Sequence, residues 1–457
     1  MRFPTRSDSP STPSAVGFVF AFLVLLMTPG LSAQTLFTVN SADDVDDGSC
    51  DPAHCSLREA ITAANHDAAG GIIHFSIPGA GPHTIQPLSA LPALEGDVII
   101  DGTSEPDFAD TPIIELDGSL AGEAHGFDIV GSQNLIRGLV INRFALNGIS
   151  IDTDCTFNLV EGNFIGTDLT GTLDLGNGNA GVLIRQAANN TVGGRTAAAR
   201  NLISGNIEGV TIVDVSATGN VVEGNYIGTG VTGTGAIPNT VGVLLLAPGN
   251  TVGGTAAGSG NLISGNTGDG IGLGPPNATG NLILGNRIGV NAAGTAALGN
   301  DVGIRVDNVA DNVIGGRSVE ARNLISGNRE GITLWAQGAT GTLIEGNYIG
   351  TNAAGDASVP NQMGFAIYGP GNTVGGTEAG AGNLISGNTE NGITFYGEQA
   401  SGNLVQGNLI GTDAAGTSAL GNVQNGIAIV LASANTVGGD TPGARNVISG
   451  NGFDGVY

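Results

Sequence analysis

Asp152 and Asp154 form the closest local pair of side chains in this sequence that could carry out acid–base chemistry. A glycoside hydrolase needs two placed carboxyl groups, and a polysaccharide lyase needs a base beside an acidic sugar. Downstream of Asp154 the chain contains neither histidine nor lysine, so candidate bases are scarce there. We keep Asp152 and Asp154 as the weak catalytic candidates, prefer the interpretation that they belong to an acidic turn, and predict no catalytic residue.

A second group of residues has side chains of the types that bind ligands. It comprises Arg305, Asp307, Trp335, Tyr368 and Tyr396, which fall at outward positions of the first strand in four successive repeats. Aromatic rings at a regular spacing suit stacking against sugar rings. The alternative is that the rings pack on one another or under loops, because equivalent positions in other repeats hold apolar residues. These five residues are the predicted ligand-binding set.

Five aspartates near the start of the chain are candidate oxygen ligands for a cation, namely Asp43, Asp44, Asp46, Asp47 and Asp51. Their spacing does not match the EF-hand loop, so a solvated acidic loop is the preferred interpretation. We predict no cofactor and no metal site, with Ca²⁺ as the alternative.

Cys50 and Cys55 are close enough to close a small disulfide loop, which leaves Cys155 unpaired. A zinc site formed by both cysteines and His54 is the alternative. It is less favoured because no second ligand pair follows at a zinc-site spacing.

The composition of the 457 residues restricts the possible partners. The formal net charge is -26, and the sequence contains no lysine, which disfavours nucleic acid and anionic membrane surfaces. Such an acidic chain would also repel a polyuronate. A polysaccharide or cell-surface glycan remains as the predicted partner.

Residues 1–33 have the features of a secretory signal peptide. Arg2 and Arg6 precede an apolar stretch, and Leu31-Ser32-Ala33 gives a small-residue cleavage site. The stretch is short for a membrane span, and no later segment is long enough. We therefore expect a secreted protein, extracellular or at the cell surface, that does not span the membrane.

Three short strings recur along the chain about every 61 residues. One of them, Asn-Leu-Ile-Ser-Gly-Asn, begins at Asn201, Asn261, Asn323 and Asn383. Gly-apolar-x-apolar strings divide each long repeat into two coils of alternating length, and each coil contains three short strand patterns separated by Gly or Asn. The pattern predicts an all-β fold, a right-handed parallel β-helix, in which two families of loops project from two different edges.

An asparagine precedes the third strand in ten successive coils: Asn163, Asn201, Asn225, Asn261, Asn286, Asn323, Asn347, Asn383, Asn408 and Asn446. Stacked amides can hydrogen-bond along the axis. We interpret these residues as a structural ladder.

A solenoid has open strand edges at its ends, so a cap is expected at its start. Ser56 and Glu59 form a capping box before the apolar stripe of a short amphipathic helix within residues 55–65. The predicted division is a signal peptide (1–33), an N-terminal cap (34–80) and the β-helix (81–457). Because residues 452–457 end where a new coil should begin, we expect the natural protein to continue.

The run Cys55-Ser56-Leu57-Arg58-Glu59-Ala60, followed by residues 61–65, resembles the signature of the CSLREA-domain family. The resemblance implies an exported bacterial protein with β-helix repeats of the pectin-lyase-like fold. That family has no established catalytic residues to transfer. Asp152-Thr153-Asp154 also resembles part of the paired-aspartate region of polygalacturonases, but the other elements of that family are missing downstream.

These observations favour a secreted or cell-surface β-solenoid scaffold of the adhesin type that contacts glycans. The alternative is a polysaccharide lyase or glycoside hydrolase of the pectin-lyase-like fold, and we lean against enzymatic activity.

Overall fold

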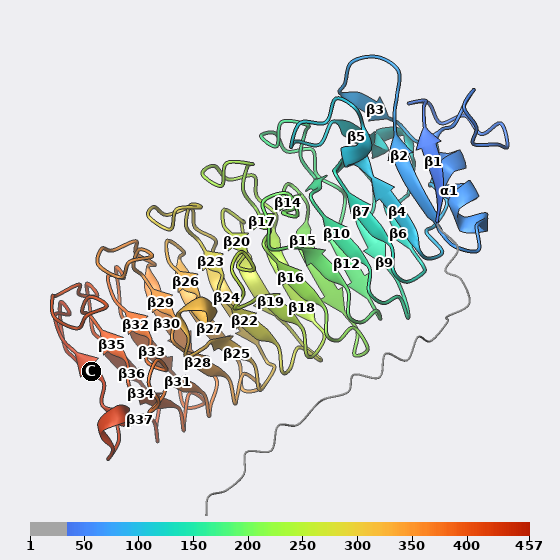
Figure 1. Ribbon diagram of the computed structural model, residues 1–457. Coiled ribbons are helices and arrows are strands. Elements are labelled where there is room, and N and C mark those ends of the chain that lie inside the picture. Colours follow the sequence, from blue (N-terminus) through green and yellow to red (C-terminus); the bar gives the residue numbers. More distant parts are fainter. Residues whose placement is uncertain (1–33) are drawn as a thin grey trace, which may run out of the picture. The chain divides into compact units, whose positions relative to one another are not determined.

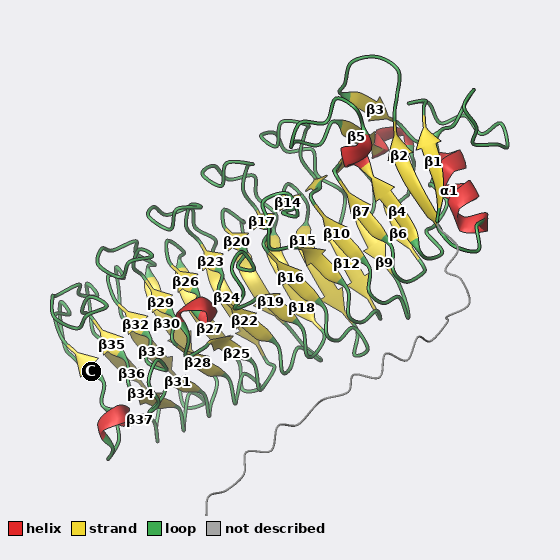
Figure 2. Ribbon diagram, viewed as in Figure 1, coloured by secondary structure: helices red, strands yellow, loops and turns green. Residues whose placement is uncertain are grey.

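The computed structural model describes residues 34–457, so the predicted signal peptide lies outside the described residues. The described part is a parallel β-helix whose strands form three long parallel sheets (Figures 1 and 2). Successive coils wind in the right-handed sense that parallel crossovers adopt. The predicted fold class is confirmed.

Each regular coil contributes one strand to each sheet. Sheet A contains β1 (Thr35–Val39), β2 (Gly71–Phe75), β4 (Val98–Asp101), β7 (Leu135–Arg137), β10 (Leu159–Glu161), β13 (Thr191–Gly193), β16 (Val221–Glu223), β19 (Thr251–Gly253), β22 (Leu282–Leu284), β25 (Val313–Gly315), β28 (Leu343–Glu345), β31 (Thr373–Gly375), β34 (Leu404–Gln406) and β37 (Thr436–Val437). Sheet B contains β3 (His83–Ile85), β5 (Ile114–Asp117), β8 (Leu139–Asn142), β11 (Phe164–Ile165), β14 (Leu202–Ile203), β17 (Tyr226–Ile227), β20 (Leu262–Ile263), β23 (Arg287–Ile288), β26 (Leu324–Ile325), β29 (Tyr348–Ile349), β32 (Leu384–Ile385), β35 (Leu409–Ile410) and β38 (Val447–Ile448). Sheet C contains β6 (Phe127–Ile129), β9 (Ile149–Ile151), β12 (Ala180–Arg185), β15 (Glu208–Val213), β18 (Val241–Leu246), β21 (Asp269–Leu273), β24 (Val302–Asp307), β27 (Glu330–Trp335), β30 (Met363–Ile367), β33 (Ile393–Tyr396) and β36 (Ile427–Val430).

Helices are few in the described residues. They are α1 (Leu57–His66) and four short 3₁₀ turns: η1 (Gly102–Ser104), η2 (Gly118–Leu120), η3 (Val319–Ala321) and η4 (Pro442–Ala444). No helix within residues 34–457 has the length and hydrophobicity needed to cross a bilayer.

The core consists of aliphatic side chains that stack on equivalent residues of the next coil. In sheet C, Ile184 lies beside Ile212, and Ile212 beside Leu245, all fully buried. β-branched side chains suit this pleated, fully covered environment. In-register pairing repeats the same contact about every 4.8 Å along the axis, so a short sequence unit suffices to build a long core.

The predicted asparagine ladder between sheets A and B is present. Each side-chain amide from Asn163 to Asn408 donates from Nδ2 to Oδ1 of the next asparagine, at 2.9 to 3.2 Å. The same Oδ1 atoms accept the preceding asparagine's backbone N–H, as from Asn225 to Asn261 at 2.9 Å. These bonds supply partners for backbone groups at a buried corner, where unpaired polar groups would be costly.

Two further asparagine ladders occupy the other corners, and the sequence analysis missed them. One runs between sheets B and C through Asn177, Asn206, Asn239, Asn266, Asn300, Asn328, Asn361, Asn388, Asn422 and Asn451. The other runs between sheets C and A through Asn134, Asn158, Asn190, Asn220, Asn250, Asn281 and Asn312, and again through Asn372, Asn403 and Asn435. Every corner of the regular coil therefore has its own amide ladder.

The long loops after the third strands fold into small hairpins on one edge of the solenoid. An antiparallel bridge closes each of them, for example Thr229 with Ala236 and Thr412 with Ala419. The shorter loops lie between sheet A and sheet B in the alternate coils, as in η3. The predicted two loop families are thus found on two different edges.

The first strands of the solenoid lie within the segment predicted as the N-terminal cap. β1 and β2 lie within residues 34–80, yet they pair in parallel with each other, and β2 pairs with β4. Sheet A is therefore continuous across residue 80, because a parallel strand needs only an in-register neighbour and not a complete coil. Helix α1 packs beside β1 and β2, and Ser56 and Glu59 form its capping box.

Thr342 interrupts the ladder between sheets C and A. Its backbone N–H donates to Oδ1 of Asn372 at 3.0 Å, but its own hydroxyl is buried without a hydrogen-bond partner. Thr342→Asn should restore the rung and raise the free energy of unfolding by about 1 kcal/mol, because one net hydrogen bond is gained in a buried corner. Guanidinium unfolding followed by circular dichroism measures the change.

Asn372→Thr is the matched control, since it creates the same interruption one coil later. We expect it to lower the free energy of unfolding by about 1 to 3 kcal/mol, the cost of leaving buried groups unpaired. Equal stability of the wild type and both variants would show that the ladders contribute nothing.

Candidate functional site

The outer face of sheet C carries both groups of predicted site residues. Asp152 follows β9 and lies beside Arg185 of β12, because Ile151 pairs with Ile184. The same outward column continues through Val213 and Leu246 and later reaches Asp307 beside Trp335. Asp152 and Trp335 therefore occupy one column, six coils apart, or roughly 29 Å at the spacing of parallel strands.

Arg185, the ion-pair partner of Asp152, lines a pocket of about 340 Å³ on this face; we call it the Asp152 pocket, although Asp152 itself is not among its lining residues. Its lining residues are His125, Asn147, Ser150, Asn179, Ala180, Leu183, Arg185, Glu208 and Thr211. Arg185 donates to Oδ1 of Asp152 from Nε at 2.7 Å and pairs with it through Nη2 at 2.6 Å. The carboxylate of Asp152 is thereby fixed in position and compensated by one guanidinium.

Asp154 does not belong to this pocket. It is exposed, lies in a turn with a φ of 65°, and its backbone N–H donates to the carbonyl of Gln186. A two-residue spacing would place both carboxylates on one face only if the strand continued, but β9 ends at Ile151. The predicted pair is therefore separated by the turn.

Asp128 and His125 are residues of this region that the sequence analysis missed. Burial, together with the negative charge of Asp152, raises the pKa of Asp128, and Oδ1 of Asp128 is buried without a hydrogen-bond partner. Burial lowers the pKa of His125. Asp128 is the outward residue of β6, and β6 pairs with β9, so aligning the first strands of successive coils would have brought it beside Asp152.

Glu208 is the one carboxyl residue that lines the Asp152 pocket, and burial raises its pKa as well. The hydroxyl of Thr211 is buried there without a partner. A carboxyl group whose pKa is raised holds its proton to higher pH and is better suited to act as a general acid, and a carboxylate held by arginine can act as a base or nucleophile. The pocket therefore has the components of acid–base chemistry.

Arg305 belongs to a charged network in the middle of sheet C. Its Nε donates to both carboxylate oxygens of Asp269, at 3.0 and 2.9 Å. One coil further on, Arg329 pairs with Asp301 and Glu330. The guanidinium of Arg305 is thus held by Asp269 and not by Asp307, which lies in the next outward column beside Trp335.

The three predicted aromatic residues form a continuous stack. Trp335 meets Tyr368 edge to face, with ring centroids 4.7 Å apart and an interplanar angle of 62°. Tyr368 and Tyr396 are parallel within 15° at 5.0 Å. The tyrosine rings therefore cover each other, as the alternative interpretation held, whereas the Trp335 side chain remains 45% exposed. Of these three residues, Trp335 offers the most open aromatic surface to a ligand.

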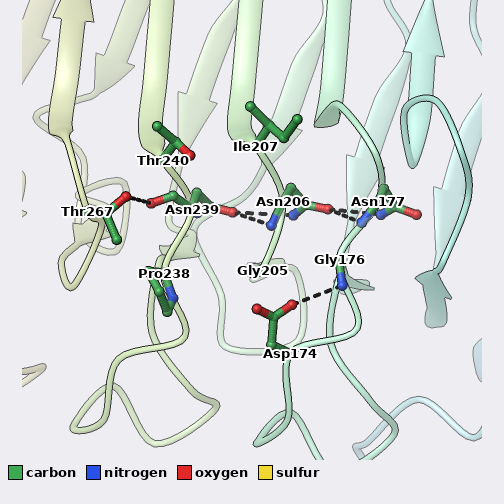
Figure 3. Close-up of a pocket in the computed structure, with 10 residues that line it drawn as sticks. All are labelled: Asp174, Gly176, Asn177, Gly205, Asn206, Ile207, Pro238, Asn239, Thr240 and Thr267. Atoms are coloured by element: carbon green, nitrogen blue, oxygen red, sulfur yellow. Dashed lines mark hydrogen bonds between the residues drawn. The ribbon is translucent and has the colours of Figure 1, made fainter.

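A hollow of about 440 Å³ lies at the corner between sheets B and C (Figure 3). The ladder residues Asn177, Asn206 and Asn239 form its floor, and their amides bond to one another. Asp174 is the one ionisable residue in its lining, and it accepts the backbone N–H of Gly176 at 3.0 Å. This hollow therefore lacks groups for catalysis.

The five aspartates near the start of the chain do not all meet at one centre. Asp44 pairs with Arg58 at 2.9 and 3.0 Å, and Asp51 accepts the backbone N–H of Ala53. Cys50 and Cys55 form a disulfide, so their sulfur atoms are not available as zinc ligands. Cys155 is free and buried, and burial raises its pKa to about 11, which makes it a poor nucleophile.

No family model matches the chain, and a search of curated proteins finds no match. Several solved structures are similar. The A-module of the mannuronan C-5 epimerase AlgE4 of Azotobacter vinelandii is 15% identical, with 87% of this chain and 98% of that chain covered and a TM-score of 0.41. DFA-IIIase from Arthrobacter chlorophenolicus is 14% identical, with 91% and 98% covered and a TM-score of 0.38. PfbA, a surface adhesin of Streptococcus pneumoniae, is 11% identical, with 92% of each chain covered and a TM-score of 0.29. At such low similarity these matches do not indicate an activity, and the fold assignment rests on the three sheets described above.

The raised pKa of Asp128 predicts a specific dependence of stability on pH. The folded-state pKa lies above the ordinary value of 3.8, so the unfolded chain binds fewer protons and stability falls as the pH rises through the folded-state pKa. Asp128→Asn removes the titrating carboxyl group and therefore this loss of stability. We expect the variant to be more stable than the wild type at pH 7 and equally stable at pH 3, as measured by guanidinium unfolding at both pH values.

Asp154→Asn, which changes an exposed carboxylate two residues from Asp152, is the control and should show no such gain. If Asp128→Asn and the wild type have the same midpoint at pH 7, the carboxyl group of Asp128 is not destabilised in the folded protein.

Proposed function

We propose that this protein is an exported β-solenoid scaffold that binds a glycan along the outer face of sheet C, with Trp335 as the main contact. The observation that carries the proposal is the half-exposed indole of Trp335, which lies beside Asp307 and on the same sheet as the fixed charged pairs of Arg305 and Arg329. Trp335 follows Thr333 on β27, and Thr333 donates its hydroxyl to Glu330. The apolar face of a sugar ring suits an aromatic ring, while its hydroxyl groups suit positioned carboxylates and guanidinium groups.

The charged groups beside Trp335 are held in place by their own pairs. Asp269 and Arg305 form a two-point contact, and Arg329 bridges Asp301 and Glu330 across adjacent coils. Side chains that are already ordered lose little conformational entropy when a ligand binds. The charged side chains on this face are therefore already ordered for binding a hydroxyl-rich ligand.

The charge of the chain favours a neutral glycan over a polyuronate. The net charge of -26 raises the energy of any polyanion that approaches. On this face the arginines Arg185, Arg305 and Arg329 are all paired with carboxylates, so none offers an uncompensated positive charge.

Cleavage of the bound glycan is a second candidate function, and the Asp152 pocket favours it. In a glycoside hydrolase mechanism, Glu208 or Asp128 would donate a proton to the leaving group, and Asp152 would act as base or nucleophile. The raised pKa of both Glu208 and Asp128 supports this division of roles.

Export and membership of the CSLREA-domain family remain part of the proposal. They rest on residues 1–33 and on the run from Cys55 to Ala60. In the structure that run leads into α1, and Cys55, Ser56 and Leu57 are buried against the first strands, which gives the signature a packing role.

Removal of the indole tests the binding proposal. Trp335→Ala should weaken binding of a glycan identified on a glycan array by about tenfold or more, since a central aromatic contact is worth above 1 kcal/mol. Phe157→Ala, which removes a 65% exposed aromatic side chain outside sheet C, should leave the affinity unchanged. Isothermal titration calorimetry provides the measurement, and equal affinities of Trp335→Ala and wild type would reject Trp335 as the contact.

Asp152→Asn tests the catalytic candidate. If the pocket cleaves the bound glycan, release of reducing ends should fall at least 100-fold in this variant, the size of a lost acid–base contribution. Asp154→Asn should retain full release, because Asp154 is exposed in the turn after β9, whereas Asp152 is the residue that pairs with Arg185 of the pocket. Absence of release by the wild type from every glycan that it binds would remove the catalytic candidate and leave the binding function.

A further inference from the structure

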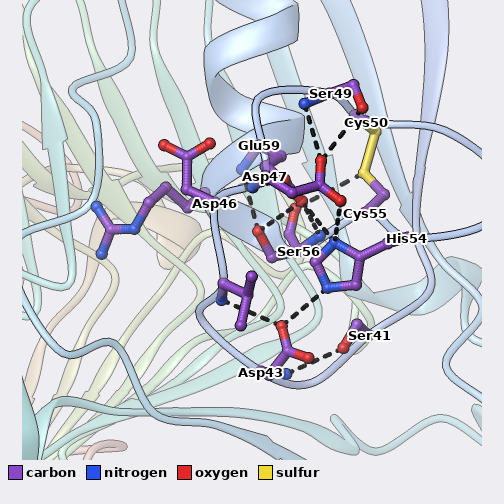
Figure 4. A network of polar contacts seen from close by, with 12 residues as sticks. Ser41, Asp43, Asp46, Asp47, Ser49, Cys50, His54, Cys55, Ser56 and Glu59 are labelled. Atoms are coloured by element: carbon purple, nitrogen blue, oxygen red, sulfur yellow. Dashed lines mark hydrogen bonds and ion pairs between the residues drawn. A yellow bond between two sulfur atoms is a disulfide. The ribbon is translucent and has the colours of Figure 1, made fainter.

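The loop between β1 and α1 brings a histidine and three carboxylates together (Figure 4). The disulfide between Cys50 and Cys55 closes this loop and holds His54 beside the first turn of α1. Glu59 comes from that first turn, whereas Asp43 and Asp47 come from the loop itself. Elements on both sides of the disulfide therefore meet at one imidazole ring.

Three potential ligand atoms surround one point. Nδ1 of His54 lies 3.1 Å from Oε2 of Glu59 and 3.7 Å from Oδ2 of Asp47. All three ligand atoms lie within 4.8 Å of one another. Ligands at about 2.0 to 2.2 Å from a tetrahedral Zn²⁺ ion are separated from each other by roughly 3.3 to 3.6 Å. The two separations from Nδ1 of His54, 3.1 and 3.7 Å, lie just below and just above this range.

The surrounding hydrogen bonds hold these atoms in positions from which they can bind a cation. Nε2 of His54 lies 3.0 Å from Oδ1 of Asp43, and in the tautomer with the proton on Nε2 the other ring nitrogen, Nδ1, is able to bind a cation. Oδ1 of Asp47 accepts the backbone N–H of Ser49 at 3.2 Å, which leaves Oδ2 for another partner. Glu59 is oriented by the N–H groups of Ser56 and Asp47. A carboxylate behind a ligating histidine is the usual outer shell of a zinc site.

Nδ1 of His54 lies on the side of the ring that faces the carboxylates of Glu59 and Asp47. The atom is buried and has no well-aligned hydrogen bond. It faces the carboxylate of Glu59, whose side chain is only 2% exposed. A divalent cation bound by this nitrogen and the carboxylates would compensate the negative charge that Asp43, Asp47 and Glu59 gather around the ring.

We propose that Nδ1 of His54, Oδ2 of Asp47 and Oε2 of Glu59 bind one divalent transition-metal ion of the Zn²⁺ class. Imidazole nitrogen is a ligand that Zn²⁺ accepts and that Ca²⁺, an oxygen-binding cation, does not use. The two carboxylates neutralise the charge of the ion. With three protein ligands, the fourth position is left to water, and the ion connects the disulfide loop to α1. This site differs from the calcium alternative in ligands and in metal.

Titration of the full-length mature protein without an affinity tag tests the proposal. After treatment with a chelator, the wild type should bind one equivalent of Zn²⁺, and Co²⁺ should give the visible absorption bands of tetrahedral coordination. His54→Ala should weaken Zn²⁺ binding at least 100-fold, and Asp43→Asn about 10- to 100-fold because it removes only the outer-shell partner. Calorimetry and metal analysis by mass spectrometry give the stoichiometry and affinity.

Asp51→Asn is the matched control, since Asp51 lies in the same loop but makes only local contacts with the turn around Ala53. It should bind Zn²⁺ like the wild type. Asp47→Asn changes an exposed side chain outside the capping box, so it reports on binding even if His54→Ala fails to fold. The proposal is overturned if the wild type does not bind micromolar Zn²⁺, or if a folded His54→Ala or Asp47→Asn variant binds it as tightly as the wild type. Tighter binding of Ca²⁺ than of Zn²⁺ would likewise reject it.

Discussion

In-register parallel stacking is the constraint on which the rest of this structure depends. Each coil can bury its aliphatic side chains only if the next coil presents the same type of residue at the same position. The corners pose the harder problem, because tight turns expose backbone groups that no strand partner satisfies. Asparagine solves it at all three corners, since one amide accepts from the backbone of one coil and donates to the next, as Asn225 does with Asn201 and Asn261.

The same constraint separates structural from functional positions. Inward positions and corners are occupied by residues that must repeat, whereas outward positions of sheet C can vary from coil to coil without cost to the stack. Along a single column the charged residues Asp152 and Arg185 are followed by the apolar residues Val213 and Leu246, and further along by Asp307 and the aromatic Trp335. A ligand that extends along the axis would meet these differences in sequence order. In such a molecule, the residues that bind a ligand are those that differ from the repeat on one face.

The N-terminal region is stabilised by interactions that are not part of the repeat. Its disulfide, capping box and histidine lie outside the repeat, and each stabilises a loop that lacks neighbouring coils on one side. A small unit with little core gains most from such cross-links. The proposed metal site belongs to this set, because it would connect the loop to α1 where hydrophobic contacts are few.

The sequence by itself determined the coil, its three strands, the ladder through Asn163 to Asn446 and the capping box at Ser56, because each depends on contacts that repeat at a fixed spacing or within one helical turn. It also located the aromatic column, since period-two alternation distinguishes outward from inward residues. Only the tertiary structure decided which side chains meet across coils. Asp128 joins Asp152 from the preceding coil, Asp154 is turned away, and Tyr396 covers Tyr368. The physical reason is that register between coils, and the turn after each strand, set these distances, and neither is encoded in the spacing of residues along a single strand.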